Sequence, residues 1–235
     1  MPTRRSLRAE IAIVLAVTFG TSGLRAALRL VDSLLAPAPL NEQAVTLNDA
    51  QSTLTWLDLA LQATSALTLF AWGALALYLL GERLGGPSIS DWLRGAGLAA
   101  LIGVPGLVLY LAALHFGWTK EVIVSTDAAR LPTLLLWSAA NAFGEEIVVV
   151  AWLCTRLKQL GWAPAKFIAA SAVLRGTYHL YQGVSAGFGN IVMGVVYGWF
   201  YHRTGRIWPL ILGHFLIDAT AYLGYRWLDL SWLGL

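Results

Sequence analysis

Residues 132–157 have the sequence PTLLLWSAANAFGEEIVVVAWLCTRL, and this stretch decides the fold. Nearly all of its side chains are apolar, and about 20 such residues in a row are enough for one helix to cross a bilayer. Two adjacent acids, Glu145 and Glu146, lie near the middle, far from the proline that opens the stretch and from Arg156 near its end. The stretch therefore predicts a membrane-spanning helix that carries two carboxylates at mid-depth.

The rest of the chain has the composition of a membrane protein. Of its 235 residues, 57% are apolar and only 12% are charged, and the mean hydropathy is +0.64. A soluble domain carries about a quarter charged residues, so this chain is too poor in charge to be water-borne. Eleven Trp, eight Tyr and eight Phe supply the aromatic residues that two membrane interfaces use. A single cysteine, Cys154, excludes an internal disulfide framework and a metal site with several thiolates.

Apolar segments bounded by charges, proline and glycine predict an all-α, polytopic integral membrane bundle of about seven transmembrane helices. We expect one integral membrane domain over residues 1–235, with a motif-bearing core at about 132–230. The predicted spans are Ile11–Val31, Leu54–Leu80, Trp92–His115, Pro132–Leu157, Phe167–Tyr181, Ile191–Tyr201 and Ile207–Leu230. The segment 32–53, which contains two prolines and three acids, is predicted to be a polar loop.

The basic residues predict the orientation of these spans. A cytoplasmic N-terminus puts ten of them inside, namely Arg4, Arg5, Arg8, Arg83, Arg94, Arg156, Lys158, Lys166, Arg203 and Arg206. It puts at most five outside, namely Arg25, Arg29, Lys120, Arg130 and Arg226. Because short inner loops are enriched in Lys and Arg, we expect the N-terminus in the cytoplasm. A chain this short, without an internal-membrane targeting signal, favours the plasma membrane of a bacterium. The scattering of the bases between apolar runs argues against a nucleic-acid partner.

Ionisable side chains gather in the apolar segments of the C-terminal half. They are Glu145, Glu146, Arg175, His179, His214 and Asp218. An Asp, Lys or Arg at a helix centre costs roughly 2.5 to 3.5 kcal/mol, so four such residues cost on the order of 12 kcal/mol. That is comparable with the whole stability of an ordinary domain. The cost is tolerable only if these side chains face one another, and a cluster of this kind is a candidate functional site.

The spacing of these residues suggests how they are arranged. Two adjacent glutamates in a helix point about 100° apart, so they need not share one role. Arg175 and His179 are one turn apart and share a face, as do His214 and Asp218. Each piece has a plain structural alternative: a solvated helix end, a satisfied core histidine, or a local hydrogen bond between His and Asp. Three such pieces on successive segments favour a site.

These motifs resemble those of the CAAX protease and bacteriocin-processing family, also called the Abi or type II CAAX prenyl endopeptidase family. The family pattern is Glu-Glu-x-x-x-Arg, then Phe-x-x-x-His, then His-x-x-x-Asn/Asp. This sequence carries Glu145 and Glu146, then His179, then His214 with Asp218. The order, the spacing and the membrane setting together make the resemblance fairly specific.

The resemblance covers residues 141–221, about a third of the chain, and this sequence departs from the family pattern at two positions. Val150 stands where the arginine of the first motif is expected, and Arg175 stands where the phenylalanine of the second is expected. The loss of one arginine and the gain of the other can be a single relocation of the positive charge. Our hypothesis is that Arg175, on the neighbouring helix, replaces the arginine of the first motif and pairs with Glu146. The alternative is that the departures mark a catalytically silent relative.

The resemblance implies an intramembrane endopeptidase that hydrolyses membrane-associated peptides or proteins. It implies that Glu145 and His179 activate a water molecule between them, while His214 and Asp218 line the oxyanion side and Arg175 supports the site. A carboxylate donates a hydrogen bond only when it is protonated. Asp218 therefore either carries a proton in that role or acts by orienting His214.

Zinc is the alternative chemistry, and Glu145, His179 and His214 are the residues that could hold it. No His-Glu-x-x-His helix is present, so we expect a metal-free glutamate mechanism without a cofactor. The expected partners are the lipid bilayer and a peptide or lipidated protein substrate. Two other functions compete with the protease: a silent membrane scaffold of the same fold, and a proton-coupled carrier, since intramembrane Glu, His and Arg also build proton relays.

Overall fold

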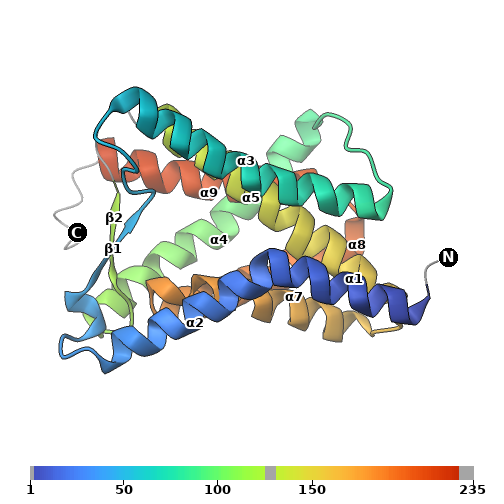
Figure 1. Ribbon diagram of the computed structural model, residues 1–235, viewed down its shortest axis with the longest axis horizontal. Coiled ribbons are helices and arrows are strands. Elements are labelled where there is room, and N and C mark those ends of the chain that lie inside the picture. Colours follow the sequence, from blue (N-terminus) through green and yellow to red (C-terminus); the bar gives the residue numbers. More distant parts are fainter. Residues whose placement is uncertain (1–2, 125–130, 228–235) are drawn as a thin grey trace. The chain divides into compact units, whose positions relative to one another are not determined.

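The computed structural model describes residues 3–124 and 131–227, and over these residues the protein is almost entirely helical (Figure 1). Its helices are α1 (Arg4–Val17), α2 (Phe19–Leu35), α3 (Thr55–Leu80), α4 (Ile89–His115), α5 (Leu131–Glu145), α6 (Leu153–Gln159), α7 (Pro164–His179), α8 (Val184–Thr204) and α9 (Trp208–Trp227). A π-helix, Glu146–Trp152, joins α5 to α6. Two short strands, β1 (Ala44–Leu47) and β2 (Glu121–Val124), pair with each other.

Three stretches are long and apolar enough to cross a membrane: α3, α4 and the continuous helical run Leu131–Gln159. The pair α1 and α2 would be a fourth span if it acts as one. These helices support an integral membrane protein. The predicted number of seven spans is not confirmed within residues 3–124 and 131–227, although the predicted apolar segments are largely helical there. The end of the last predicted span, residues 228–230, lies outside the described residues.

The first predicted span, 11–31, is not a single straight helix. α1 and α2 meet at Thr18 and are bent by 49°. The hydroxyl of Thr18 donates to the carbonyl of Val14 at 2.6 Å, and its N–H bonds to the carbonyl of Leu15. Side-chain hydrogen bonds of this kind compete with the helical ladder and bend helices. The apolar pattern hid this break because threonine does not interrupt an apolar run.

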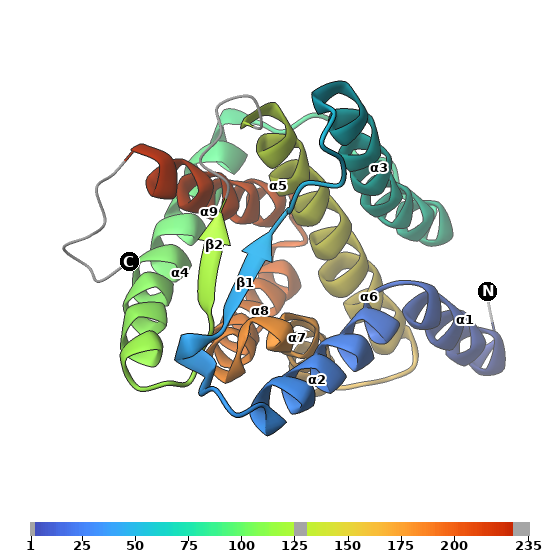
Figure 2. The same ribbon diagram turned by 60° about the vertical axis from the view of Figure 1, so that its left-hand side comes forward.

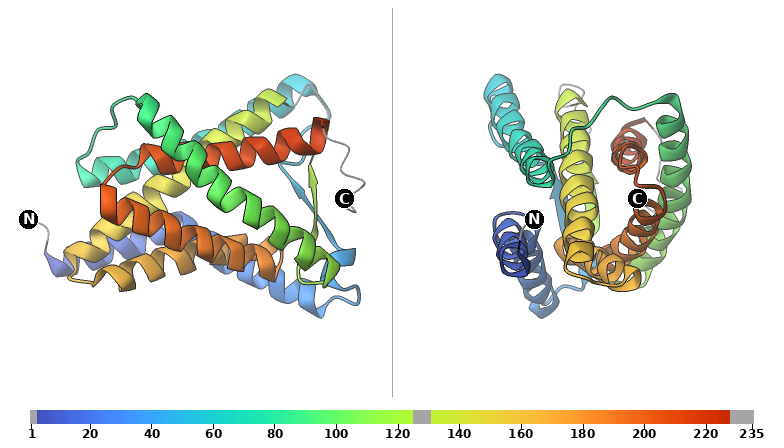
Figure 3. Two further views of the ribbon diagram at one scale, coloured as in Figure 1. Left: turned by 180° about the vertical axis from the view of Figure 1, so that it is seen from behind. Right: turned by 90° about the vertical axis from the view of Figure 1, so that its right-hand side faces the viewer.

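One of two units of the chain comprises residues 1–43, 108–121 and 147–206. Within it α7 and α8 lie side by side, as Figure 3 shows. A Cβ added at Gly176 would lie 2.4 Å from Cγ1 of Ile191, and one added at Gly194 would lie 2.6 Å from Cα of Ala172. Glycines at these positions therefore allow the two helices to pack closely.

The turn between α7 and α8 fixes where α7 ends. His179 is the last residue of α7, and a 3-10 turn, Leu180–Gln182, leads to Gly183 at φ +131°. Glycine is the residue that adopts this conformation without strain, and a Cβ there would also lie 2.6 Å from Cα of Thr119. The N–H of Val184 donates to the carbonyl of Trp118 at 3.1 Å. The chain near Thr119 therefore holds the end of α7 in place.

The other unit comprises residues 44–107, 122–146 and 207–235. α3 and α9 both pack on α5, and Gly144 brings α5 so close to α3 that a Cβ there would lie 2.9 Å from the carbonyl oxygen of Leu69. The amide oxygen of Gln62, which is fully buried on α3, accepts a hydrogen bond from Nε1 of Trp137 on α5 at 2.6 Å. These contacts fix the phase of α5 against α3.

Figure 2 shows β1 and β2 side by side. The prediction of a polar loop over 32–53 is therefore wrong in part, because α2 extends to Leu35 and β1 occupies Ala44–Leu47. Alternate residues of β1 are exposed and half-buried, which is the pattern of a strand with one covered face. Four residues are too short a run for this alternation to be recognised in the sequence.

Candidate functional site

The two adjacent glutamates lie where the helix changes its geometry. Glu145 is the last residue of α5, and Glu146 is the first residue of the π-helix. Both are buried, and Glu146 is completely so. The span predicted over residues 132–157 agrees with the continuous helical run Leu131–Gln159, whose geometry changes from α to π at Glu146. π-helical turns are rare and occur frequently at functional sites, and here one begins at a candidate catalytic carboxylate.

Glu146 and His214 form a direct buried contact. Oε1 of Glu146 lies 2.8 Å from Nδ1 of His214, and neither side chain is more than 7% exposed. Nε2 of the same imidazole lies 3.7 Å from Oδ1 of Asp218, one turn further along α9. The ring of His214 thus lies between two carboxylates. A histidine held in this way has a fixed orientation and can exchange a proton with either neighbour.

His179 is oriented by its own helix. Its Nδ1 lies 2.9 Å from the backbone carbonyl oxygen of Arg175. A carbonyl oxygen only accepts hydrogen bonds, so Nδ1 carries the proton and Nε2 is the basic nitrogen of the neutral ring. The ring also lies 4.7 Å from that of Tyr178. These contacts select one tautomer of His179, with Nε2 suited to accept a proton.

Arg175 is completely buried on α7. Its Nη1 lies 3.8 Å from Sδ of Met193, and its guanidinium carbon lies 5.6 Å from the ring centre of Tyr197, both on α8. The distance to the Tyr197 ring is that of a cation–π contact. The predicted pair of Arg175 with Glu146 joins residues of different units, so it stays a prediction. Val150, the other departure from the family pattern, is completely buried in the π-helix.

The structure brings Glu146, His214 and Asp218 together within one unit, to which Glu145 also belongs. Arg175 and His179 belong to the other unit, and the roles predicted for them stay predictions. Within the described part of the chain, no group of three His, Cys, Asp or Glu side chains could hold a metal ion.

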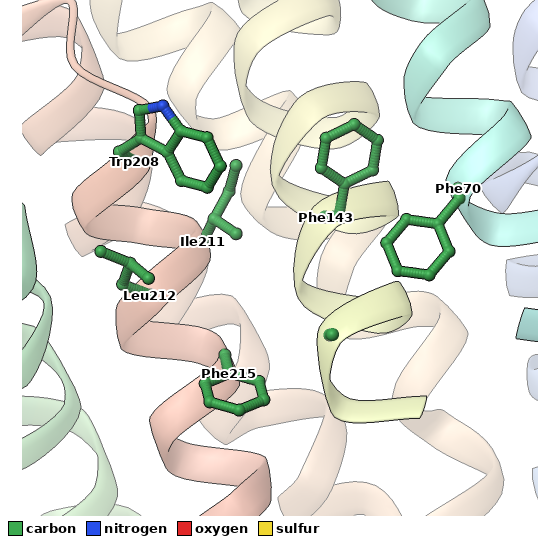
Figure 4. A pocket seen from close by; sticks show the side chains of 7 residues that line it. Phe70, Phe143, Trp208, Ile211, Leu212 and Phe215 are labelled. Carbon is green, nitrogen blue, oxygen red and sulfur yellow. The ribbon is translucent and has the colours of Figure 1, made fainter. Parts of the chain in front are cut away.

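An apolar pocket of about 280 Å³ lies between α3, α5 and α9 (Figure 4). It is lined by Phe70, Ala139, Phe143, Trp208, Ile211, Leu212 and Phe215. Phe143 lies three residues before Glu146, and Ile211 lies three residues before His214, so the pocket and the Glu146–His214 pair share the same helix faces. The pocket could have been sought in the sequence from the apolar residues Phe143 and Ile211, which lie about one turn before Glu146 and His214.

A second buried polar cluster escaped the sequence analysis. Oε1 of Glu10 accepts hydrogen bonds from Nε1 of Trp152 at 2.9 Å and from Nε of Arg156 at 2.7 Å. The signal that could have revealed it is a single acid at the start of the first apolar segment, between the bases near the N-terminus and Ile11. Such an acid needs a partner if it enters the membrane.

Comparisons with known proteins agree with the resemblance seen in the sequence. Residues 127–220 match the family model described as type II CAAX prenyl endopeptidase Rce1-like. No curated protein and no solved structure gives a significant match. The matched segment contains Glu145, Glu146, His179, His214 and Asp218. This match, over the part of the chain that carries all three motifs, supports membership of the protein in the CAAX protease and bacteriocin-processing family.

Proposed function

We propose that the protein is an intramembrane CAAX-protease-type endopeptidase, which hydrolyses a peptide bond of a membrane-associated substrate through a water molecule activated by glutamate and histidine. The observation that carries this proposal is the buried contact of Glu146 with His214, with Asp218 beside the other ring nitrogen. It lies within the segment that matches the Rce1-like family, in a chain with several candidate membrane spans. The proposal includes a bacterial plasma membrane and a cytoplasmic N-terminus.

Hydrolysis without a covalent intermediate needs a base for the attacking water, donors for the oxyanion and a proton for the leaving amine. The proposal makes Glu145 the general base, which takes a proton from the attacking water and passes it to the leaving amine, while Nε2 of His179 accepts a hydrogen bond from the same water. In its protonated form His214 donates through Nδ1 to Glu146, which holds the ring, and through Nε2, which faces Asp218, to the oxyanion. Because the carboxylate of Glu146 is completely buried, its charge acts on His214 with little screening by water.

The apolar pocket supports a lipidated substrate. Its volume of about 280 Å³ is roughly twice that of an apolar cavity that binds benzene, at about 150 Å³. Its lining is aromatic and aliphatic throughout, and the rings of Phe70 and Phe143 lie 5.6 Å apart on one side. An isoprenoid chain attached near the scissile bond has the size and polarity to enter this pocket. We therefore propose a prenylated peptide or protein as substrate.

The test is hydrolysis of quenched fluorescent peptides by the purified full chain in nanodiscs, with farnesylated and unlipidated forms of one peptide. Glu145→Gln and His179→Ala are expected to abolish cleavage. Glu82→Gln and His115→Ala are the matched controls, because both side chains are exposed and lie outside the motifs. Cleavage by the wild type and both controls, and by neither motif variant, supports the protease. No cleavage by a folded wild type favours the scaffold, and substrate-dependent flux in vesicles favours the carrier.

The same preparation tests metal dependence. We expect full activity after exhaustive chelation and no stoichiometric zinc in the purified protein. Loss of activity on chelation, with recovery on adding zinc alone, would overturn the metal-free mechanism. It would not overturn the protease, since Glu, His and Asp side chains are also zinc ligands.

A further inference from the structure

We propose that Glu10 and Ser171 are positioning residues, which hold the π-helix Glu146–Trp152 in its register and thereby orient the carboxylates of Glu145 and Glu146. This inference rests on the proposed function. It starts from the sequence of the π-helix itself, in which Glu146 is followed only by apolar residues, three of them the consecutive valines 148–150. β-branched residues are poor helix formers, so little in this sequence favours a particular helical geometry.

Side chains from two other helices contact this segment. The hydroxyl of Ser171 on α7, which is completely buried, donates to the backbone carbonyl of Val149 at 2.7 Å. A π-helix bonds each carbonyl one residue further along the chain than an α-helix does. The carbonyl of Val149 therefore has an external donor at the middle of the irregular stretch.

The second contact is at the end of the segment. Glu10 on α1 accepts from Nε1 of Trp152, the last π-helical residue, and from Nε of Arg156 on α6. The side chain of Arg156 is 7% exposed, and its Nη1 also donates to Oε1 of Gln159 at 2.9 Å. Removing one partner of a largely buried charged pair is strongly destabilising. Glu10 therefore fixes both the end of the π-helix and the middle of α6.

The register of the segment decides where the glutamates point. A π-helix accommodates about one extra residue per turn, and each residue of an α-helix turns the chain by about 100°. If the segment relaxed to an α-helix, the direction of the glutamates at its start relative to the side chains that follow them in the same helical run would change by about one residue. Misplacement of a catalytic group by about 1 Å can cost about 100-fold in rate.

The experiment compares Glu10→Gln and Ser171→Ala with Ser138→Ala in the peptidase assay. Ser138 is a matched control because it is completely buried and its hydroxyl bonds only within α5, to the carbonyl of Leu134. We expect the first two variants to lower kcat by about 10- to 100-fold with an unchanged KM, since positioning and not binding is lost. The conservative variant Glu10→Asp is expected to recover part of the rate. Unchanged kcat in both positioning variants would overturn the inference.

A deletion distinguishes positioning from general stability. Removing one of the three consecutive valines gives the same sequence whichever is removed, and it takes the extra residue out of the segment. The glutamates of this shortened chain keep their phase in a regular α-helix, so the deletion is expected to restore most of the activity of Ser171→Ala. If Ser171 acted only through stability, the deletion would lower activity further, and that result would overturn the proposed role.

A readout without activity separates this inference from the proposed function. Hydrogen–deuterium exchange of the peptide that contains residues 146–152 is expected to be faster in Glu10→Gln and Ser171→Ala and unchanged in Ser138→Ala. A wild type that cleaves nothing overturns the proposed function and the catalytic part of this inference. Unchanged exchange in the two variants overturns the claim that these residues hold the segment, whether or not the wild type cleaves peptides.

Discussion

His214 on α9 and Glu146, the first residue of the π-helix, face each other, with Nδ1 of the imidazole 2.8 Å from Oε1 of a carboxylate that is completely buried. Burial makes this contact informative, because an isolated buried carboxylate would cost several kcal/mol. The histidine supplies the partner, and Asp218 on the other side of the ring adds a second acceptor. A proton that moves between Glu146 and His214 leaves the total charge of the three groups unchanged.

The first prediction concerns the coupling of Glu146 with His214. Glu146→Gln and His214→Gln are each expected to lower kcat by about 10²- to 10³-fold, the usual cost of losing one oxyanion donor, because His214 supplies that donor and Glu146 orients it. The kcat of the double variant is expected to be no lower than that of the less active single variant, since the two residues act as one unit. Steady-state kinetics of the three variants in nanodiscs check this. Losses that multiply in the double variant would mean that the two residues act independently.

The second prediction concerns the packing of α7 against α8. Gly176→Ala puts a Cβ 2.4 Å from Cγ1 of Ile191 and 2.7 Å from the backbone oxygen of Gly187. We expect the variant to lose about 1 to 3 kcal/mol, as overpacked sites do, and to melt at a lower temperature in detergent.

Gly97→Ala on α4 is the control for this substitution. A Cβ at Gly97 meets nothing within 4 Å. Alanine is favoured over glycine in a helix by about 0.5 to 1 kcal/mol, so this variant is expected to melt at or above the wild-type temperature. Equal melting of both variants would contradict the close approach of α7 and α8.

The sequence predicts some features of this protein well because they depend on simple periodicities. Long apolar runs bounded by charge predict helices, and α3 and α4 agree with the predicted spans to within a few residues. His214 and Asp218 are i and i+4 on α9, and spacing alone places them on one face. Local features of this kind need no knowledge of the tertiary fold.

Other features depend on partners that are distant in the sequence. The π-helix cannot be recognised in the sequence Glu-Ile-Val-Val-Val-Ala-Trp, because its register is supported by Ser171 and Glu10 from two other helices. The bend at Thr18 is accompanied by side-chain hydrogen bonds that its hydroxyl donates and its carbonyl accepts. Glu146 and His214 are 68 positions apart in the chain. The sequence therefore identifies both as candidate site residues but does not predict that they are in contact.

The third prediction concerns the pocket. Ala139→Leu adds three carbons to its wall, and we expect KM for a farnesylated peptide to rise about 10-fold while hydrolysis of the unlipidated peptide is unchanged. A few methylenes are worth this much in an apolar pocket. Ala100→Leu, on the exposed side of α4, is the control. If Ala139→Leu raised KM equally for both peptides, the pocket would not be where the lipid chain binds.

The last prediction concerns the tautomer of His179. Because Nδ1 donates to the carbonyl of Arg175, the ¹⁵N spectrum of labelled protein is expected to show a protonated Nδ1 and an unprotonated Nε2 at neutral pH. An asparagine at this position can place its N–H₂ group near the site of Nδ1 and keep that hydrogen bond, but it lacks a basic nitrogen. His179→Asn is therefore expected to melt close to the wild type and to lose about 10²- to 10⁴-fold in kcat.

Exposed His202 provides the control, and His202→Asn is expected to change neither melting nor kcat. An active His179→Asn variant would mean that the ring serves only to cap the end of α7. An inactive variant that also melts far below the wild type would leave packing as the simpler cause, in which case the ¹⁵N spectrum decides. A ring protonated on Nε2 alone would reverse the roles of the two nitrogens and remove His179 as a proton acceptor at that atom.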